Sequence, residues 1–145
     1  FYFVMIYFIK NTNFAKEGEV MKIMESAENY LETILILQKR NGSVRSIDIV
    51  NELDYTKPSV SIAMKNLREN GYIEMDSSGF ITLLESGRKI AEKIYERHTF
   101  ISDWLISLGV TPTVAADDAC RMEHVISEES FKAIKNHVHM KKASE

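Results

Sequence analysis

One thiol, one carboxylate and one imidazole lie within five residues in the C-terminal part of the chain. Cys120, Glu123 and His124 have the spacing i, i+3, i+4, which places three side chains on one face of a helix. Thiolate, carboxylate and imidazole groups are all metal ligands. A lone cysteine is also a common small core residue. The three residues by themselves therefore leave two interpretations open, one half of a metal site or a chance grouping.

The charge around these residues favours a cation. Residues 100–131 contain six Asp or Glu and one Arg, and crowded carboxylates repel one another until a cation binds. An ion with five or six ligands needs further donors. Asn29 and Glu32, spaced i, i+3 in an expected first helix, and His98 in a long helix can supply them. Taken alone, Glu32 is equally an ordinary helix acid, and His98 an ordinary core or interface histidine.

The donor types leave the identity of the metal open between two groups of ions. A thiolate from Cys120 suits Fe(II), Co(II), Ni(II) or Zn(II), whereas the oxygens of Asn29 and Glu32 suit harder ions such as Mn(II). We expect Fe(II), with Mn(II) as the close alternative. Zn(II) would also bind well by its position in the affinity order, so site geometry or cellular supply would have to exclude it.

The elements that must position these residues are predicted to be mainly α-helical. Residues 26–42 form a helix with Ser26 as N-cap and Gly42 as its end, because apolar residues recur at helical spacing between them. Three more helices are expected in the second half of the chain, within residues 85–109, 111–127 and 127–138. The first of these opens on a capping box of Thr82 and Glu85, and Thr113 is the expected cap of the second.

A helix-turn-helix followed by a β-hairpin lies between these parts. Residues 46–55, with Ser46 as cap, and residues 57–71 are two short helices joined by a tight turn. Residues 72–83 alternate apolar and polar positions around the turn sequence DSSG, which indicates a hairpin. Together they predict a winged helix, which is more specific than either part alone.

The winged-helix part also carries positive charge. Residues 39–68 contain six Lys or Arg and three Asp or Glu, although the whole chain has a net charge of −3. Cations suit phosphates, and short polar side chains at the start of the second helix suit base edges and backbone. Ordinary solvated polar residues are the alternative. We expect double-stranded DNA to contact Arg45, Thr56, Lys57, Pro58, Ser59, Ser61, Lys65 and Arg68.

The composition is that of a folded intracellular protein. Hydrophobic residues make up 45% of the chain, enough for a packed core. The single cysteine excludes an internal disulfide and fits a reducing compartment, so we expect a cytoplasmic protein without a membrane span. Nothing in the sequence resembles a zinc-protease, P-loop or nucleophile-elbow motif, and we therefore expect no enzyme activity.

The first twenty residues differ from the rest. They open with nine apolar residues, a run too short to span a bilayer and without the basic leader of a secretory signal. We expect residues 1–20 to be a non-native or upstream-translated extension, with translation starting at Met21 or Met24. A genuine extra strand or helix packed on the body is the alternative. Residues 141–145, and the tail from His139 more generally, are expected to be loose.

Several motifs together resemble the diphtheria toxin repressor and manganese transport regulator family. The sequences AENYLETI, KPSVS, LRENGYI, SGRKIAEKIYERH and DACRMEHVIS occur in the order and spacing of that family, over roughly residues 24–138. The resemblance implies the two-domain form, a homodimeric metal-dependent transcriptional repressor that binds operator DNA. Residues 21–84 would be the winged-helix DNA-binding domain, and residues 85–140 the helical dimerisation and metal-binding domain.

The resemblance also implies a ligand set, with departures. Cys120, Glu123 and His124 match the iron-responsive branch, and His98 matches a metal-binding histidine of the family. Glu32 matches a carboxylate of the manganese branch, while Asn29 stands where that branch has Asp and the iron branch has Met. The site is thus a hybrid of the two branches.

Two further departures concern the second metal site and DNA recognition. Ser102 and Ala116 stand where the second site of the iron branch has a carboxylate and a histidine. Ile62 replaces a glutamine that reads bases in the iron branch, so a different operator is expected.

The sequence leaves two alternative functions. One is a winged-helix transcriptional regulator whose helical half only dimerises, without sensing metal. The other is a metal-dependent hydrolase with Glu123 as base, against which the absence of a second ligand cluster and the presence of the wing both argue.

Overall fold

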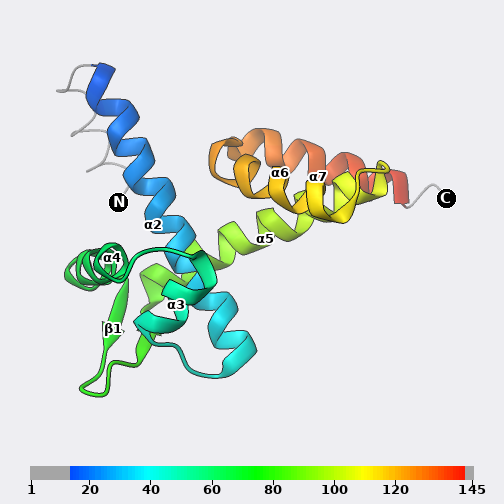
Figure 1. The fold of residues 1–145 in the computed structure, drawn as a ribbon. Coiled ribbons are helices and arrows are strands. Elements are labelled where there is room, and N and C mark those ends of the chain that lie inside the picture. The colour runs from blue at the N-terminus through cyan, green and yellow to red at the C-terminus, as the bar shows by residue number, and fades with distance from the viewer. Residues whose placement is uncertain (1–13, 143–145) are drawn as a thin grey trace.

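The computed structural model describes residues 14–142 of the chain, and the side chains of residues 24–140 (Figure 1). The described part is mainly helical, with one small antiparallel sheet. Its elements are α2 (Phe14–Asn41), α3 (Ser46–Leu53), α4 (Lys57–Glu69), β1 (Ile73–Met75), β2 (Ile81–Leu83), α5 (Glu85–Ser107), α6 (Pro112–Val125) and α7 (Glu128–Lys142). The predicted fold class is therefore confirmed.

The first half is a helix-turn-helix packed on α2. The apolar face predicted for the first helix is buried in full, and α3 and α4 cover it with their own apolar faces. Burial of these side chains is the main stabilising contribution to this half, at roughly 1.5–3 kcal/mol for each large aliphatic residue. The core comprises Tyr30, Leu31, Ile34, Leu35, Leu37, Val44, Ile49, Val60, Met64, Leu67, Ile73, Ile81, Leu83 and Ala91.

The predicted hairpin forms the wing. Strand β1 pairs antiparallel with β2, with Ile73 opposite Leu83 and Met75 opposite Ile81. Asp76 closes the turn, since its Oδ1 accepts hydrogen bonds from the backbone N–H groups of Ser78 and Phe80. The wing therefore follows directly from the DSSG turn and its alternating flanks.

Helix α5 connects the two halves. It begins against the winged helix and extends away from it to α6 and α7, which lie along its far part (Figure 1). A second apolar cluster there includes Ile101, Ala119 and Phe131. The chain thus has two cores along one long helix, and α2 and α6 both pack on α5.

Several predicted helix starts were wrong. Ser26 is no N-cap, because α2 begins at Phe14 and runs through it. Helix α3 begins at Ser46 itself, and Arg45 occupies the N-cap position, so Ser46 is not the cap of this helix. Residue Leu84 precedes α5 and no side-chain cap forms there, so the Thr82–Glu85 capping box is absent; Thr82 lies in β2.

The C-terminal helices also differ at their ends from the expected ones. Helix α6 is preceded by Thr111 and has Pro112 in its first turn, the position that proline favours, so Thr113 is not its cap. Ser127 does cap α7, since its hydroxyl accepts a hydrogen bond from the backbone N–H of Ser130. Helix α7 continues to Lys142 and so includes His139, which was expected to lie in a loose tail.

The expected extension falls partly outside the described residues. Residues 1–13 and 143–145 lie beyond them, whereas residues 14–20 are the first turns of α2. Among the helices of the described residues, none has the length and apolar character needed to cross a membrane.

Candidate metal centre and nucleic-acid interface

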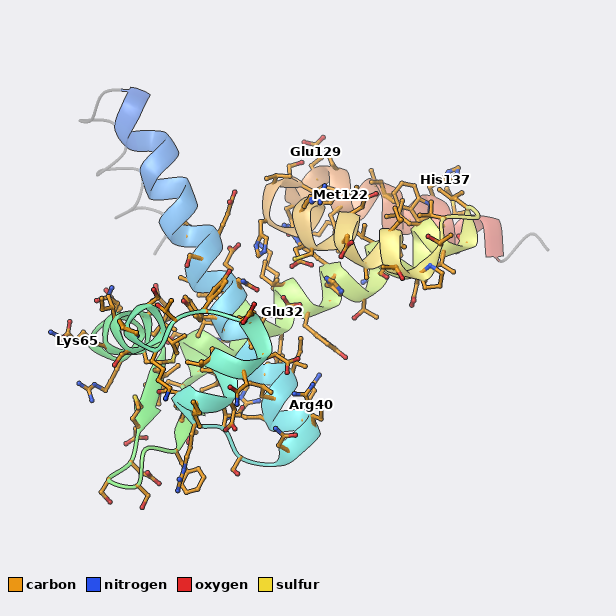
Figure 2. All side chains as sticks on the ribbon, in the orientation of Figure 1. Glu32, Arg40, Lys65, Met122, Glu129 and His137 are labelled. Atoms are coloured by element: carbon orange, nitrogen blue, oxygen red, sulfur yellow. The ribbon has the colours of Figure 1, made fainter. Side chains whose placement is uncertain are left out.

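Three helices bring three ligand groups together. Glu32 of α2, His98 of α5 and Glu123 of α6 each offer one ligand atom, and these atoms all lie within 4.8 Å of one another. Figure 2 labels Glu32 where α2 passes α5. The convergence arises because α2 and α6 pack against the same helix, α5, on which His98 lies between them.

The two carboxylates are buried without adequate partners. Glu32 is 5% exposed and Glu123 is fully buried, and one oxygen of each, Oε1, has no hydrogen-bond partner among the described residues. Burial, and then the charge of Glu123, raise the pKa of Glu32 to about 7. Two buried carboxylates this close are unfavourable unless a proton or a cation lies between them.

The histidine of the cluster is already paired. His98 Nδ1 lies 2.7 Å from Glu123 Oε2. This bond raises the pKa of His98 against the opposing effect of its partial burial. Because an ionised carboxylate can only accept, Nδ1 carries the proton. A cation that binds Nδ1 itself must therefore displace this proton, whereas Glu123 Oε2 has further lone pairs for a cation.

His124 lies at the edge of the cluster and has two acidic neighbours. Its Nε2 is 3.3 Å from Glu123 Oε1, and its Nδ1 is 2.8 Å from Glu28 Oε2 on α2. The bond to Glu28, opposed by partial burial, raises the pKa of His124. Glu28 is a residue of the site that was not predicted from the sequence. Its spacing of four residues from Glu32 was the available signal, since it puts both carboxylates on one face of α2.

A buried arginine holds the end of α6 that carries the site. Arg97, 6% exposed, donates from Nη1 to the backbone carbonyls of Glu123 and Ile126, each at 3.0 Å, and from Nη2 to Glu128 Oε2 at 2.8 Å. Cationic donors suit the free carbonyls of a helix C-terminus. Arg97, which sequence reasoning also missed, thereby fixes the position of Glu123 relative to His98, its neighbour on α5.

Cys120 and Asn29 lie outside the three-residue cluster. Cys120 is exposed overall, but its thiol is partly desolvated and faces the charges of Glu123 and Glu32, and these effects raise its pKa. A thiol with a raised pKa binds metal only when the ion displaces its proton. Asn29 is half-buried on α2, one turn before Thr33, whose hydroxyl donates to the Asn29 carbonyl. Their roles as ligands stay predictions.

The arrangement has the composition of a divalent transition-metal site. Two buried carboxylates and a histidine converge, a second imidazole nitrogen lies beside one of them, and two carboxylate oxygens lack partners. Oxygen and imidazole donors suit Mn(II) and Fe(II). The residues present therefore fit a bound ion of this kind.

The second surface of interest is the exposed side of α4. Thr56 caps this helix, since its Oγ1 accepts from Ser59 N at 3.3 Å and lies 2.8 Å from Ser59 Oγ. Pro58 lies in the first turn, a position that proline favours. All seven residues predicted here are exposed, namely Thr56, Lys57, Pro58, Ser59, Ser61, Lys65 and Arg68. Figure 2 shows Lys65 pointing away from the body of the molecule.

A hollow and the wing adjoin this helix. The hollow has a volume of about 350 Å³ and is lined in part by Ser61, Lys65 and Arg68. Arg45 is exposed beside the wing, where its guanidinium lies 4.1 Å from the ring centre of Phe80. This cation–π contact orients the arginine along the hairpin. The helix and the wing thus present cations on two adjoining elements.

A winged helix joined to a helical unit, with a buried cluster of candidate metal ligands between them, is the arrangement expected of a metal-dependent transcriptional repressor. Two domain models of one protein family match the two parts of this chain. Residues 22–79 match the "Iron dependent repressor, N-terminal DNA binding domain", and residues 84–143 match the "Iron dependent repressor, metal binding and dimerisation domain". The chain belongs to this iron-dependent repressor family, whose members are regulators and not enzymes.

Individual relatives represent both the manganese and the iron branch. The transcriptional regulator MntR of Escherichia coli O157:H7 is 35% identical over 111 residues, which cover 77% of this chain and 72% of that protein. The iron-dependent repressor IdeR of Mycobacterium bovis is 27% identical over 109 residues, 74% of this chain and 47% of that protein. The alignments thus include both halves of the chain.

Solved structures share the fold. A manganese-dependent transcriptional repressor in complex with manganese has a TM-score of 0.71 at 24% identity, covering 78% of this chain and 52% of that one. The manganese regulator SloR has a TM-score of 0.69 at 23% identity, covering 78% and 53%. This chain therefore spans about half the length of those two proteins.

Proposed function

We propose that this chain is a cytoplasmic, homodimeric repressor that binds operator DNA when loaded with Mn(II) or Fe(II), and so controls genes of metal homeostasis. The observation that carries the proposal is the buried pair of carboxylates, Glu32 and Glu123, with an unpartnered oxygen on each. Such a pair is costly without a counter-charge, and a divalent ion supplies it.

The proposed ligands come from both halves of the chain. Glu32, His98, Glu123 and His124 would hold the ion, and Cys120 and Asn29 would complete its coordination after small movements. The oxygen-rich cluster shifts our preference towards Mn(II), because two carboxylates and an imidazole converge without the thiol. Zn(II), Co(II) and Ni(II) remain chemically able to bind such a set.

The location of the ligands supports a switching role. Glu32 belongs to the helix that forms the core of the winged helix, and Glu123 to the helical unit. Holding one ion, these residues would restrict the angle between the two units. In a dimer this restriction would favour the spacing of paired recognition helices that fits successive major grooves.

The domain limits follow from the same proposal. Residues 21–84 would bind DNA through Arg45, α4 and the wing, and residues 85–140 would dimerise and bind metal. The exposed hydroxyls and cations of the α4 surface support this assignment, as phosphate contacts position a recognition helix and short side chains reach base edges.

Operator titrations with single ions test the proposal. The protein is purified anaerobically, stripped with chelator, and titrated with DNA from its own promoter region in the presence of Mn(II), Fe(II), Zn(II), Co(II) or Ni(II). We expect Mn(II) or Fe(II) to restore dimer binding. Binding of equal strength in chelator and in every metal would instead favour a winged-helix regulator whose helical half only dimerises.

A further inference from the structure

Glu28 contacts the metal centre without being one of the three clustered ligands. Its side chain is 26% exposed, and its Oε2 lies 2.8 Å from Nδ1 of His124, whose side chain is 9% exposed. The two residues are far apart in sequence, on α2 and α6. This contact therefore joins the same two helices as the carboxylate pair does.

The direction of this hydrogen bond follows from the acceptor. An ionised carboxylate has no proton to donate, so Nδ1 of His124 must carry one. In the neutral ring the other nitrogen, Nε2, then keeps its lone pair. Glu28 thus selects which nitrogen of His124 is available to bind a cation.

The free nitrogen of His124, Nε2, lies beside the buried carboxylate of Glu123. It lies 3.3 Å from Glu123 Oε1, an oxygen without a hydrogen-bond partner. Two lone-pair atoms facing each other are unfavourable unless a proton or a metal ion lies between them. Glu28 therefore sets His124 so that Nε2 and a buried carboxylate oxygen face one common point.

We propose that Glu28 is a positioning residue of the metal centre, which holds His124 in the Nδ1–H tautomer with Nε2 directed towards Glu123 and the ion. Carboxylates that accept from the outer nitrogen of a ligating histidine fix its orientation and increase its basicity. The proposal rests on the proposed function, since it assumes that His124 binds metal through Nε2. It adds a residue that acts through His124 and does not itself touch the ion.

Two variants and a matched control test this role. Glu28→Ala removes the acceptor, whereas Glu28→Gln keeps an oxygen that can accept from Nδ1 but removes the charge. Glu25→Ala, one turn earlier on α2, removes the same charge without touching His124. Thermal unfolding of the metal-free proteins checks that each variant is folded.

The first readout needs no metal. Nitrogen-15 NMR of the imidazoles in the metal-free protein, at a pH where His124 is neutral, reports its tautomer. We expect Nδ1–H in the wild type, Glu25→Ala and Glu28→Gln, and a shift towards Nε2–H in Glu28→Ala. An unchanged tautomer in Glu28→Ala overturns the proposal, whatever the protein's metal response.

The second readout is Mn(II) affinity, followed by the electron paramagnetic resonance signal of the free ion. We expect about a 10- to 100-fold weakening in Glu28→Ala, an intermediate loss in Glu28→Gln, and none in Glu25→Ala. Wild-type affinity in Glu28→Ala overturns the proposal. So does equal weakening in both Glu28 variants, because it indicates a charge or direct ligand in place of an acceptor. Failure of the wild type to bind Mn(II) or Fe(II) would refute the proposed function, and the tautomer measurement would still decide what Glu28 does.

Discussion

At the scale of single residues, Glu123 is the most constrained group of the site. It is fully buried, pairs with His98 through one oxygen, and leaves the other oxygen beside His124 without a hydrogen bond. Its backbone carbonyl is held by Arg97. A buried carboxylate with this little compensation is costly for folding, since packing alone would favour an apolar residue there, and this cost supports the proposed role of Glu123 as a metal ligand.

Replacing Glu123 by glutamine separates binding from folding. Glu123→Gln keeps the shape and removes the charge, so we expect Mn(II) affinity to fall by more than the roughly 10- to 100-fold loss typical of outer partners. The metal-free protein should stay folded but unfold at a lower temperature, because His98 keeps a hydrogen-bond acceptor in the glutamine oxygen and loses the charge of its partner. Calorimetric titration measures the Mn(II) affinity, and thermal unfolding measures the stability of the metal-free protein. Asp117→Asn on the same helix serves as the control for both measurements. Unaltered metal affinity in Glu123→Gln would contradict its role as a ligand.

The pH dependence of metal affinity follows from the raised pKa values. Glu32, with a pKa of about 7, and the two histidines, with pKa values raised above 6.5, hold protons in the metal-free site at pH 6. Because the metal must displace these protons, Mn(II) affinity should fall by up to about tenfold per pH unit for each displaced proton as pH drops from 8 to 6. An Mn(II) affinity that stays constant from pH 8 to 6, measured in one buffer series, would contradict Mn(II) binding by these three residues.

Stability of the metal-free protein should change in the opposite sense. The folded pKa of Glu32 lies above its unfolded value, so the folded state binds more protons between pH 4.5 and 7 and loses stability as pH rises through that window. His98 and His124 act in the same direction, since their stabilising contribution disappears as pH rises through their raised pKa values. The stabilising effect of added metal should therefore grow with pH.

At the scale of elements, the helix faces could be predicted from sequence, and the helix ends could not. Periodic apolar residues identified the buried side of α2, because burial sets that period. Ser26 was misread as a cap, since a polar residue inside a continuing helix has the same local sequence as one at its start. The wing was predictable because its turn chemistry is local.

The ligand set shows the same division between local and tertiary information. Cys120, Glu123 and His124 are adjacent in sequence, so their common helix face was predictable. The contacts of Glu28 and Arg97 with α6 depend on how α2 and α5 meet that helix. The spacing of Glu28 from Glu32 indicates their common face of α2 but not which residues of α6 that face meets. The structure brings Glu32, His98 and Glu123 together, while Cys120 lies at the exposed side.

Gly87, in the first turn of α5, lies in close contact with the backbone just before the wing. A Cβ at Gly87 would lie 2.2 Å from the backbone oxygen of Tyr72. Alanine normally stabilises a helix interior by about 1 kcal/mol relative to glycine, but this backbone contact cannot yield, and overpacking costs about 1–3 kcal/mol. Gly87→Ala should therefore lower the free energy of unfolding, whereas Lys89→Ala on the same helix should leave it nearly unchanged. Urea unfolding measures the free energy of unfolding of both variants. A more stable Gly87→Ala protein would disprove the close contact between Gly87 and the Tyr72 backbone oxygen.

Lys65, on the exposed side of α4, is expected to contact a DNA phosphate. Within the described part of the chain, the ion pair of Lys65 is a long one of 3.9 Å with Glu69. Both side chains are exposed, and such pairs contribute little to stability. The charge of Lys65 is therefore available for a phosphate. Lys65→Ala should weaken operator binding and reduce the slope of log affinity against log salt by about one. Lys89→Ala, on α5, serves as control, and an unchanged salt slope in Lys65→Ala would remove this residue from the interface.

At the scale of the whole molecule, α5 is the element that relates the two functions. Its first turns pack on the winged helix, and its far part carries the helical unit (Figure 1). The proposed metal centre lies where α2 and α6 meet α5, between the two cores. A ligand bound at such a junction can bias the relative orientation of the halves by as much as its affinity differs between orientations.

The central claim is that Glu32 links metal binding to DNA binding by joining the winged helix to the helical unit. The most direct measurement is operator affinity, in saturating Mn(II) and in chelator, for the wild type and Glu32→Gln. We predict that metal strengthens wild-type binding by about 5- to 150-fold, the range of 1–3 kcal/mol of coupling. In Glu32→Gln this response should be lost, while binding in chelator stays at the wild-type level. A full metal response in Glu32→Gln would contradict the account.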